Sequence, residues 1–210
     1  KYTLTVVNPN APEYQLFTGN LQAGEYVVYY NKVAMKAAVS SNRLGYEAVN
    51  PIEDVIQTDN ATIIWKIEQN DGYWTLYNTS AGKYAAGNGT KNQAALVSSL
   101  SDAALWTVTV SNGKYEFVNK KNADASVNKN LRYNEGYGFA CYGTSTGGAL
   151  SLYKKADDAD AISAPTISGA DEFIESTEVT IAAEDGLKVY YTLDGTASDL
   201  DALLTINKKD

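Results

Sequence analysis

Short runs in which apolar and polar residues alternate, broken by turn-forming dipeptides, are the main pattern of residues 24–155. Alternating apolar residues flank Asp71-Gly72 and, further along, Asn112-Gly113. Both dipeptides readily adopt the positive φ angles of tight β-turns. A period of two is typical of strands that bury one face. Each segment therefore predicts a β-hairpin.

The two hairpins are copies of one pattern. Residues 65–78 align without a gap on residues 106–119, which lie 41 positions further along. The apolar and aromatic positions agree in chemical type, and both copies end in Asn. We predict that these large side chains fill a common core rather than line a ligand site. They are Trp65, Ile67, Trp74 and Leu76 in one copy, and Trp106, Val108, Tyr115 and Phe117 in the other.

A third copy is split between two distant parts of the chain. Residues 24–31 match the second half of the pattern, with one extra residue before Asn31. Residues 149–153 supply the first half, with Ser151 in the position of the Trp. Three units of roughly 42 residues are too few for a β-propeller of four or more blades. The repeat predicts a closed structure in which an early strand pairs with a late one.

The repeated Trp-x-Ile/Val and Gly-x-aromatic pattern resembles the β-trefoil superfamily, in particular the trefoil modules of large secreted bacterial proteins. The resemblance implies a six-stranded barrel capped by three hairpins over residues 22–155. Residues 1–21 would form an N-terminal strand or extension, with residues 2–7 as an added strand. Ricin-type lectins carry Gln-x-Trp in each unit, whereas Trp65 and Trp106 follow other residues here. The sugar-binding residues of that family therefore do not carry over.

A second domain is predicted after an acidic linker at residues 156–163, which shows no apolar periodicity. Strand-forming runs begin at Pro165, Glu178 and Lys188. Residues 177–195, which end in Tyr190-Tyr-Thr-Leu-Asp-Gly195, resemble the chitobiase/β-hexosaminidase C-terminal domain. That resemblance implies a small immunoglobulin-like β-sandwich over residues 164–210. Only 15 residues follow Gly195, so we expect a truncated or reduced sandwich with edges covered by another molecule. The predicted fold class is all-β.

The residue content excludes several kinds of chemistry. The chain has no His and one Cys, which excludes Ser/His/Asp and Cys/His nucleophiles and His- or Cys-ligated metals. The acidic neighbours Glu53-Asp54 and Asp157-Asp158 are expected to be solvated rather than catalytic. The acidic linker lacks the Gly and Glu of an EF-hand loop, so we do not expect it to bind calcium. We predict no enzymatic activity, no metal and no cofactor, and we interpret Cys141 as a buried, inert small side chain.

Charge and hydropathy argue against nucleic acid and the membrane interior as binding partners. The net charge is −8, and residues 156–210 carry 3 basic and 13 acidic side chains, against 14 and 12 in residues 1–155. Without a basic stripe, nucleic acid is not an expected partner. The sequence contains no run of about 18 apolar residues, so membrane insertion is not expected. The chain starts at Lys1 rather than Met, so we expect that any export signal was removed ahead of it. The resemblance to modules of secreted proteins implies an extracellular or cell-surface location.

Residues 130–142 have the strongest binding potential, because Tyr, Arg and Asn are crowded there among glycines. Aromatic faces and planar guanidinium or amide groups are the side chains that hold sugars. A hairpin with some inward-facing Tyr would have the same composition. The candidate ligand-binding residues are Arg132, Tyr133, Asn134 and Tyr137. Arg43 and Tyr46 are added because they place an Arg and a Tyr on a comparable part of the first unit.

Two functions are consistent with these observations. The first is a non-catalytic carbohydrate-binding or targeting accessory module of a secreted or cell-surface protein, with a glycan or polysaccharide as partner. It follows from the trefoil and chitobiase-type resemblances together. The alternative is a protein-interaction or structural spacer module without glycan binding, because trefoil loops also bind proteins and an incomplete sandwich edge invites a partner strand.

Overall fold

The computed structural model describes residues 11–123 and 128–156, and the backbone of residues 166–168, 180–182, 189–191 and 204–206. The chain divides into two compact units, Lys1–Ala156 and Asp157–Asp210, and each is described by itself. The strand expected at residues 2–7 lies outside the described residues. So does the expected linker, apart from residue 156.

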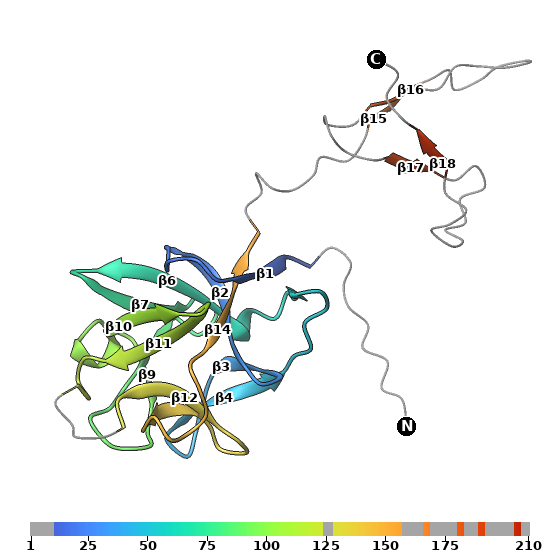
Figure 1. Cartoon of the computed structure of the whole chain (residues 1–210). Helices are drawn as coiled ribbons and strands as arrows, with labels where there is room; N and C mark the ends of the chain where they lie inside the picture. Colours follow the sequence, from blue (N-terminus) through green and yellow to red (C-terminus); the bar gives the residue numbers. More distant parts are fainter. Residues whose placement is uncertain are drawn as a thin grey trace, which may run out of the picture. The chain divides into compact units, whose positions relative to one another are not determined.

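The first unit contains a closed barrel of six antiparallel strands (Figure 1). They are β2 (Gly24–Tyr30), β6 (Ile64–Asn70), β7 (Tyr73–Asn78), β10 (Trp106–Ser111), β11 (Lys114–Asn119) and β14 (Ser151–Lys155). Pairing runs from β2 through β6, β7 and β10 to β11. The ring closes because β14 pairs with β2 and bridges to β11 through Tyr115 and Leu150.

Three hairpins cap one end of this barrel. They are β3 (Val33–Ser40) with β4 (Arg43–Ala48), β8 (Lys83–Ala86) with β9 (Ala95–Val97), and β12 (Asn130–Asn134) with β13 (Gly138–Tyr142). The hairpins bond to one another: the Ala94 N–H donates to the Asn42 carbonyl (2.8 Å), and the Asn92 N–H donates to the Cys141 carbonyl (2.9 Å). A six-stranded barrel with three hairpin caps is a β-trefoil, and the predicted fold is confirmed.

The repeated Trp residues form the core, as predicted. Trp65 and Trp106 are fully buried. Their indole Nε1–H groups donate to the carbonyls of Met35 (2.9 Å) and Ala85 (3.2 Å), each in the capping hairpin that precedes that Trp in the chain. The other repeated positions belong to the same cluster: Ile67, Leu76, Tyr115 and Phe117 are buried, and Trp74 and Val108 are partly buried. Each Trp therefore joins barrel to cap.

A repeated Asn connects neighbouring barrel strands. Asn78 and Asn119 are fully buried, and their Nδ2 atoms donate to the carbonyls of Ile64 (2.8 Å) and Leu105 (3.4 Å), the residues before each Trp. Asn31 differs, because it is exposed and lies at φ +43° in the turn between β2 and β3. The inserted residue of the split third copy thus breaks the pseudo-threefold symmetry at this position.

Two further strands extend the sheet beyond β14, and a second apolar cluster lies on the outward face of β2 and β14. The strand β1 (Glu13–Phe17) pairs with β14 on one side and with β5 (Val55–Gln57) on the other. Because strand residues alternate, Val27 and Tyr153 face outward. They pack against Tyr14, Ile56 and Ile63 in a small cluster separate from the barrel core. Ile63 ends the short helix η1 (Ala61–Ile63), and its counterpart in the next unit is η2 (Asp102–Ala104).

The second unit is described by two short antiparallel pairs of strands. β15 (Thr166–Ser168) pairs with β16 (Thr180–Ala182), and β17 (Val189–Tyr191) pairs with β18 (Leu204–Ile206). The first three strands fall on the predicted strand-forming runs, whereas β18 was not predicted. The immunoglobulin-like sandwich stays a prediction.

Gly138 allows β13 to approach β4. It lies at φ +114°, and a methyl group there would collide with the Leu44 carbonyl oxygen. Gly72 is a matched control, since it also has a positive φ (+78°) but nothing within 4 Å of an added methyl. We expect Gly72→Ala to lower the free energy of unfolding by about 1 kcal/mol, and Gly138→Ala by at least about 3 kcal/mol. Urea unfolding followed by Trp fluorescence measures both, and equal losses would contradict the close approach.

Cys141 should be unreactive in the folded protein. The side chain is fully buried, and this burial raises its thiol pKa to about 12. The thiolate fraction at pH 8 is then on the order of one in ten thousand. We expect labelling by 5,5′-dithiobis(2-nitrobenzoic acid) at pH 8 to be limited by opening of the barrel and to be fast in urea. Labelling of the native protein at the rate of the unfolded chain would contradict this burial.

Candidate functional site

The structure divides the candidate residues into separate groups around the β3–β4 and β12–β13 hairpins. Arg43 and Tyr46 both lie on β4, but three positions apart, so their side chains project from opposite faces of the strand. Arg43 packs against Tyr137, and Tyr46 packs against Tyr133. Arg132 belongs to neither group.

Arg43 and Tyr137 form an exposed aromatic and cationic pair. The Arg43 Cζ lies 5.3 Å from the centroid of the Tyr137 ring, within the range of cation–π interactions. The Nε of Arg43 donates to the Tyr142 hydroxyl (3.0 Å), and its Nη1 donates to the Ser41 carbonyl (3.0 Å). Tyr137 lies in the turn closed by its N–H bond to the Asn134 carbonyl (2.9 Å) and is 64% exposed. A ring is thus presented to solvent beside a fixed guanidinium.

Tyr46 and Tyr133 form the second group. Their ring centroids are 5.3 Å apart in an edge-to-face arrangement. Tyr133 is buried and also packs against Phe139, with 5.0 Å between centroids. Burial raises the pKa of the Tyr133 hydroxyl, which keeps it neutral. Tyr46 is 42% exposed, so Tyr133 supports a ring that Tyr46 presents to solvent.

Arg132 lies on the opposite face of β12 from Tyr133. It is buried and pairs with the Glu116 carboxylate, whose other oxygen accepts a bond from Asn130 Nδ2 (2.8 Å). The Arg132 Nε has no hydrogen-bond partner among the described residues. With 6% of its surface exposed, Arg132 connects β11 to β12 and offers a ligand little surface.

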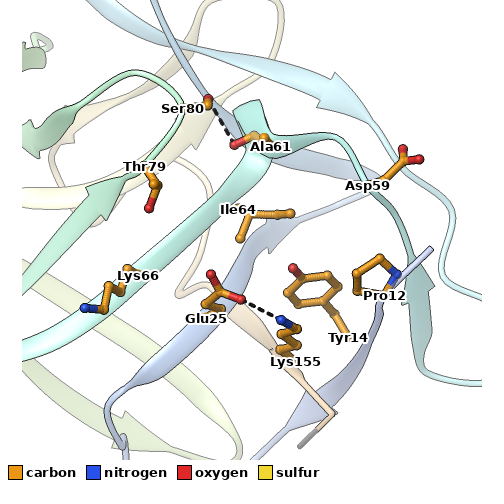
Figure 2. A pocket seen from close by; sticks show the side chains of 10 residues that line it. All are labelled: Pro12, Tyr14, Glu25, Asp59, Ala61, Ile64, Lys66, Thr79, Ser80 and Lys155. Carbon is orange, nitrogen blue, oxygen red and sulfur yellow. Dashed lines mark hydrogen bonds and ion pairs between the residues drawn. The ribbon is translucent and has the colours of Figure 1, made fainter. Parts of the chain in front are cut away.

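A pocket of about 250 Å³ lies beside the outer cluster, away from the predicted residues (Figure 2). Its wall includes a row of side chains that crosses four neighbouring strands. Tyr14 on β1 is opposite Lys155 on β14, and Glu25 on β2 is opposite Lys66 on β6. The row is continuous because Glu25 Oε2 lies 3.1 Å from Lys155 Nζ. None of the residues that line this site was among the sequence-predicted candidates, although the predicted pairing of an early strand with a late one was a signal for it.

The Tyr14 hydroxyl in this pocket stays protonated. Burial, and secondarily the nearby Glu25 carboxylate, raises the pKa of Tyr14 well above its usual range. Thr79, Ser80 and Asp59 complete the polar part of the lining, and the Ser80 hydroxyl is already bonded to Asn78 Oδ1 (2.9 Å). The pocket therefore combines neutral hydroxyls, charged groups and an apolar surface.

Within residues 11–123 and 128–156, no three or more His, Cys, Asp or Glu side chains are grouped so that they could hold a metal ion. No helix in the described part of the chain has the length and apolar character needed to span a membrane.

No protein-family model and no curated protein sequence matches this chain. Solved structures with a similar fold include SeviL bound to the asialo-GM1 saccharide, with 20% identity over 63% of this chain and 98% of that one (TM-score 0.46). A GlcNAcα1-4Gal-releasing endo-β-galactosidase from Clostridium perfringens is 17% identical over 63% of this chain, with a TM-score of 0.49, and the match spans 32% of that enzyme. A Polyporus squamosus lectin is 16% identical over 65% of this chain and 50% of its own (TM-score 0.44).

Removal of the Arg132 side chain should destabilise the trefoil. Arg132→Ala leaves the Glu116 carboxylate without its cation in a site where only 23% of that side chain is exposed, so we expect a loss of about 3 kcal/mol in the free energy of unfolding. Arg43→Ala, at a more exposed position, should lose less than about 1 kcal/mol. Urea unfolding measures both. An Arg132→Ala variant of native stability would show that the ion pair does not support the hairpin.

Proposed function

We propose that the trefoil is a non-catalytic carbohydrate-binding module of a secreted or cell-surface protein. The proposed binding surface is the cap platform, defined as the Tyr137 ring and the Arg43 guanidinium, with Tyr46 as a further contact. The observation that supports it most is the 64% exposed ring of Tyr137 with the Arg43 guanidinium 5.3 Å from its centroid.

The cap platform suits the surface of a sugar ring. A pyranose has an apolar face of C–H groups and a rim of hydroxyls, so an aromatic face and a nearby set of N–H donors can bind both. Two of the five guanidinium N–H donors of Arg43 bond within the protein, to Tyr142 and Ser41. Because these bonds already fix the side chain, little rotamer freedom remains to be lost on binding.

The remaining candidate residues are proposed to support the platform. Tyr133 packs beneath Tyr46, and the Asn134 carbonyl closes the turn that carries Tyr137. Arg132 connects β12 to Glu116. In this proposal the direct contacts come from Arg43, Tyr46 and Tyr137.

The accessory role and the location outside the cell are parts of the same proposal. The resemblance of residues 177–195 to the chitobiase/β-hexosaminidase C-terminal domain supports a setting beside carbohydrate-active modules. The second unit would then act as a spacer that carries the trefoil.

Retention on insoluble polysaccharides and a glycan array test the proposal. Once a binding glycan is found, Tyr137→Ala should weaken its Kd at least about tenfold, which corresponds to about 1.4 kcal/mol. Tyr137→Phe keeps the ring face and should remain within about threefold of the native Kd. Arg43→Ala should weaken binding as well, because it removes the neighbouring donors.

Tyr73→Ala is the matched control. Tyr73 also carries a cation near its ring, with Lys120 Nζ 4.5 Å from the centroid, but it lies on β7 of the barrel. Glycan binding should be unchanged in this variant. An equal loss in Tyr73→Ala and Tyr137→Ala would contradict the cap platform. Absence of binding to any glycan would contradict the function and favour a protein-interaction module.

A further inference from the structure

We infer that the pocket between β1, β2, β6 and β14 is a second binding site, which holds one neutral six-membered sugar ring. This inference rests on the proposed carbohydrate-binding function, but the site is separate from the cap platform. It is built where β1 lies on the outside of the barrel, and the repeated hairpins of the cap do not contribute to it.

The volume of the pocket matches that of one sugar ring. A volume of about 250 Å³ equals about eight water molecules at roughly 30 Å³ each. This is below the range of about 300–1,000 Å³ that is typical of drug-sized ligands. One pyranose with its hydroxyls matches such a space, and because the pocket is open to solvent, any further ring of the ligand would lie outside it.

The charges in the pocket favour a neutral ligand. Lys155 pairs with Glu25 at 3.1 Å, and Lys66 pairs with Glu68 at 2.8 Å. A ligand with a net charge would have to compete with one of these pairs. Hydroxyl groups instead accept from the ammonium groups and donate to the carboxylates while both pairs stay in place.

The lining has the amphipathic character that a sugar ring requires. In Figure 2, Ile64 lies at the centre of the pocket, with Thr79 and Ser80 on one side and Glu25, Tyr14 and Lys155 on the other. The half-buried Ile64 side chain provides apolar surface for a C–H face, whereas Tyr14, with 1% of its surface exposed, offers a ligand little surface. The surrounding hydroxyl, ammonium and carboxylate groups provide partners for the edge of the ring.

Occupation of the pocket is coupled to the attachment of β1. Tyr14 belongs to β1, Ile64 and Lys66 belong to β6, and Lys155 belongs to β14. A ring that contacts Pro12, the exposed residue directly before β1, together with Ile64 and Lys155 connects β1 to the barrel in addition to the backbone pairing of β1 with β14 and β5. Binding should therefore slow hydrogen exchange of the amides in residues 13–17.

The test uses the full chain and free monosaccharides, measured by isothermal titration and by hydrogen exchange of residues 13–17. Neutral hexoses and N-acetylhexosamines form one panel, and a uronic acid is the charged comparison. We expect at least one neutral sugar to slow exchange of residues 13–17 at least about threefold, both in the native chain and in Tyr137→Ala. Ala61→Trp, which fills the pocket from an exposed position, should abolish this slowing.

Two further variants keep the test independent of folding defects. Lys66→Ala removes an exposed donor from the pocket and should weaken monosaccharide binding at least about threefold. Ala48→Trp places the same bulk on an exposed position of β4 and should leave binding unchanged. Thermal unfolding of all variants confirms that each one is folded.

The outcomes separate this inference from the proposed function. If polysaccharides bind through Tyr137 while no monosaccharide slows exchange in residues 13–17, the pocket inference is overturned and the function stands. Tighter binding of the uronic acid than of every neutral sugar would overturn the assignment of a neutral ring. If neither monosaccharides nor polysaccharides bind, both are overturned. Loss of monosaccharide binding in Ala61→Trp and Lys66→Ala alone supports the pocket.

Discussion

The pairing of β2 with β14 is the constraint on which the rest of the trefoil depends. Four residue pairs, from Ser151 opposite Tyr29 to Lys154 opposite Tyr26, join strands from the two ends of the repeat. A closed barrel has no free strand edge, so the inward side chains of all six strands share one core. The other edge of β14 pairs with β1, and the outward face of the β2–β14 ladder brings Glu25 to Lys155. Barrel, outer strands and pocket thus follow from one pairing.

The repeat made the trefoil predictable because its signal is local. Asp71-Gly72 and the alternating residues around it define a hairpin without reference to any distant segment, and the second copy shows that the hairpin recurs. β1 could not be predicted in this way. Its partner β14 lies about 140 residues away, and the surface that Tyr14 covers exists only after the barrel has closed. The same reason explains why the pocket has no signature in any single segment.

The candidate residues of the cap were predicted from their side-chain chemistry. In the structure, the alternation of the strands points these side chains to opposite faces. Arg132 and Tyr133 are neighbours in sequence, so strand alternation sends one to Glu116 and the other to Tyr46. Composition indicated the right hairpin but not which of its side chains reach solvent. That depends on the turn that carries Tyr137, where the chain leaves the strand pattern and the alternation no longer applies.

Closure of the ring by its last strand also affects how the protein is made. One edge of β2 has no partner until β14 has left the ribosome. The intervening stretch of about 120 residues takes on the order of 6–24 s to synthesise at about 5–20 residues per second. During that interval the nascent chain exposes Val28 and the other apolar residues that later fill the barrel. Translation of this segment therefore creates a defined period in which chaperones can bind the unfinished trefoil.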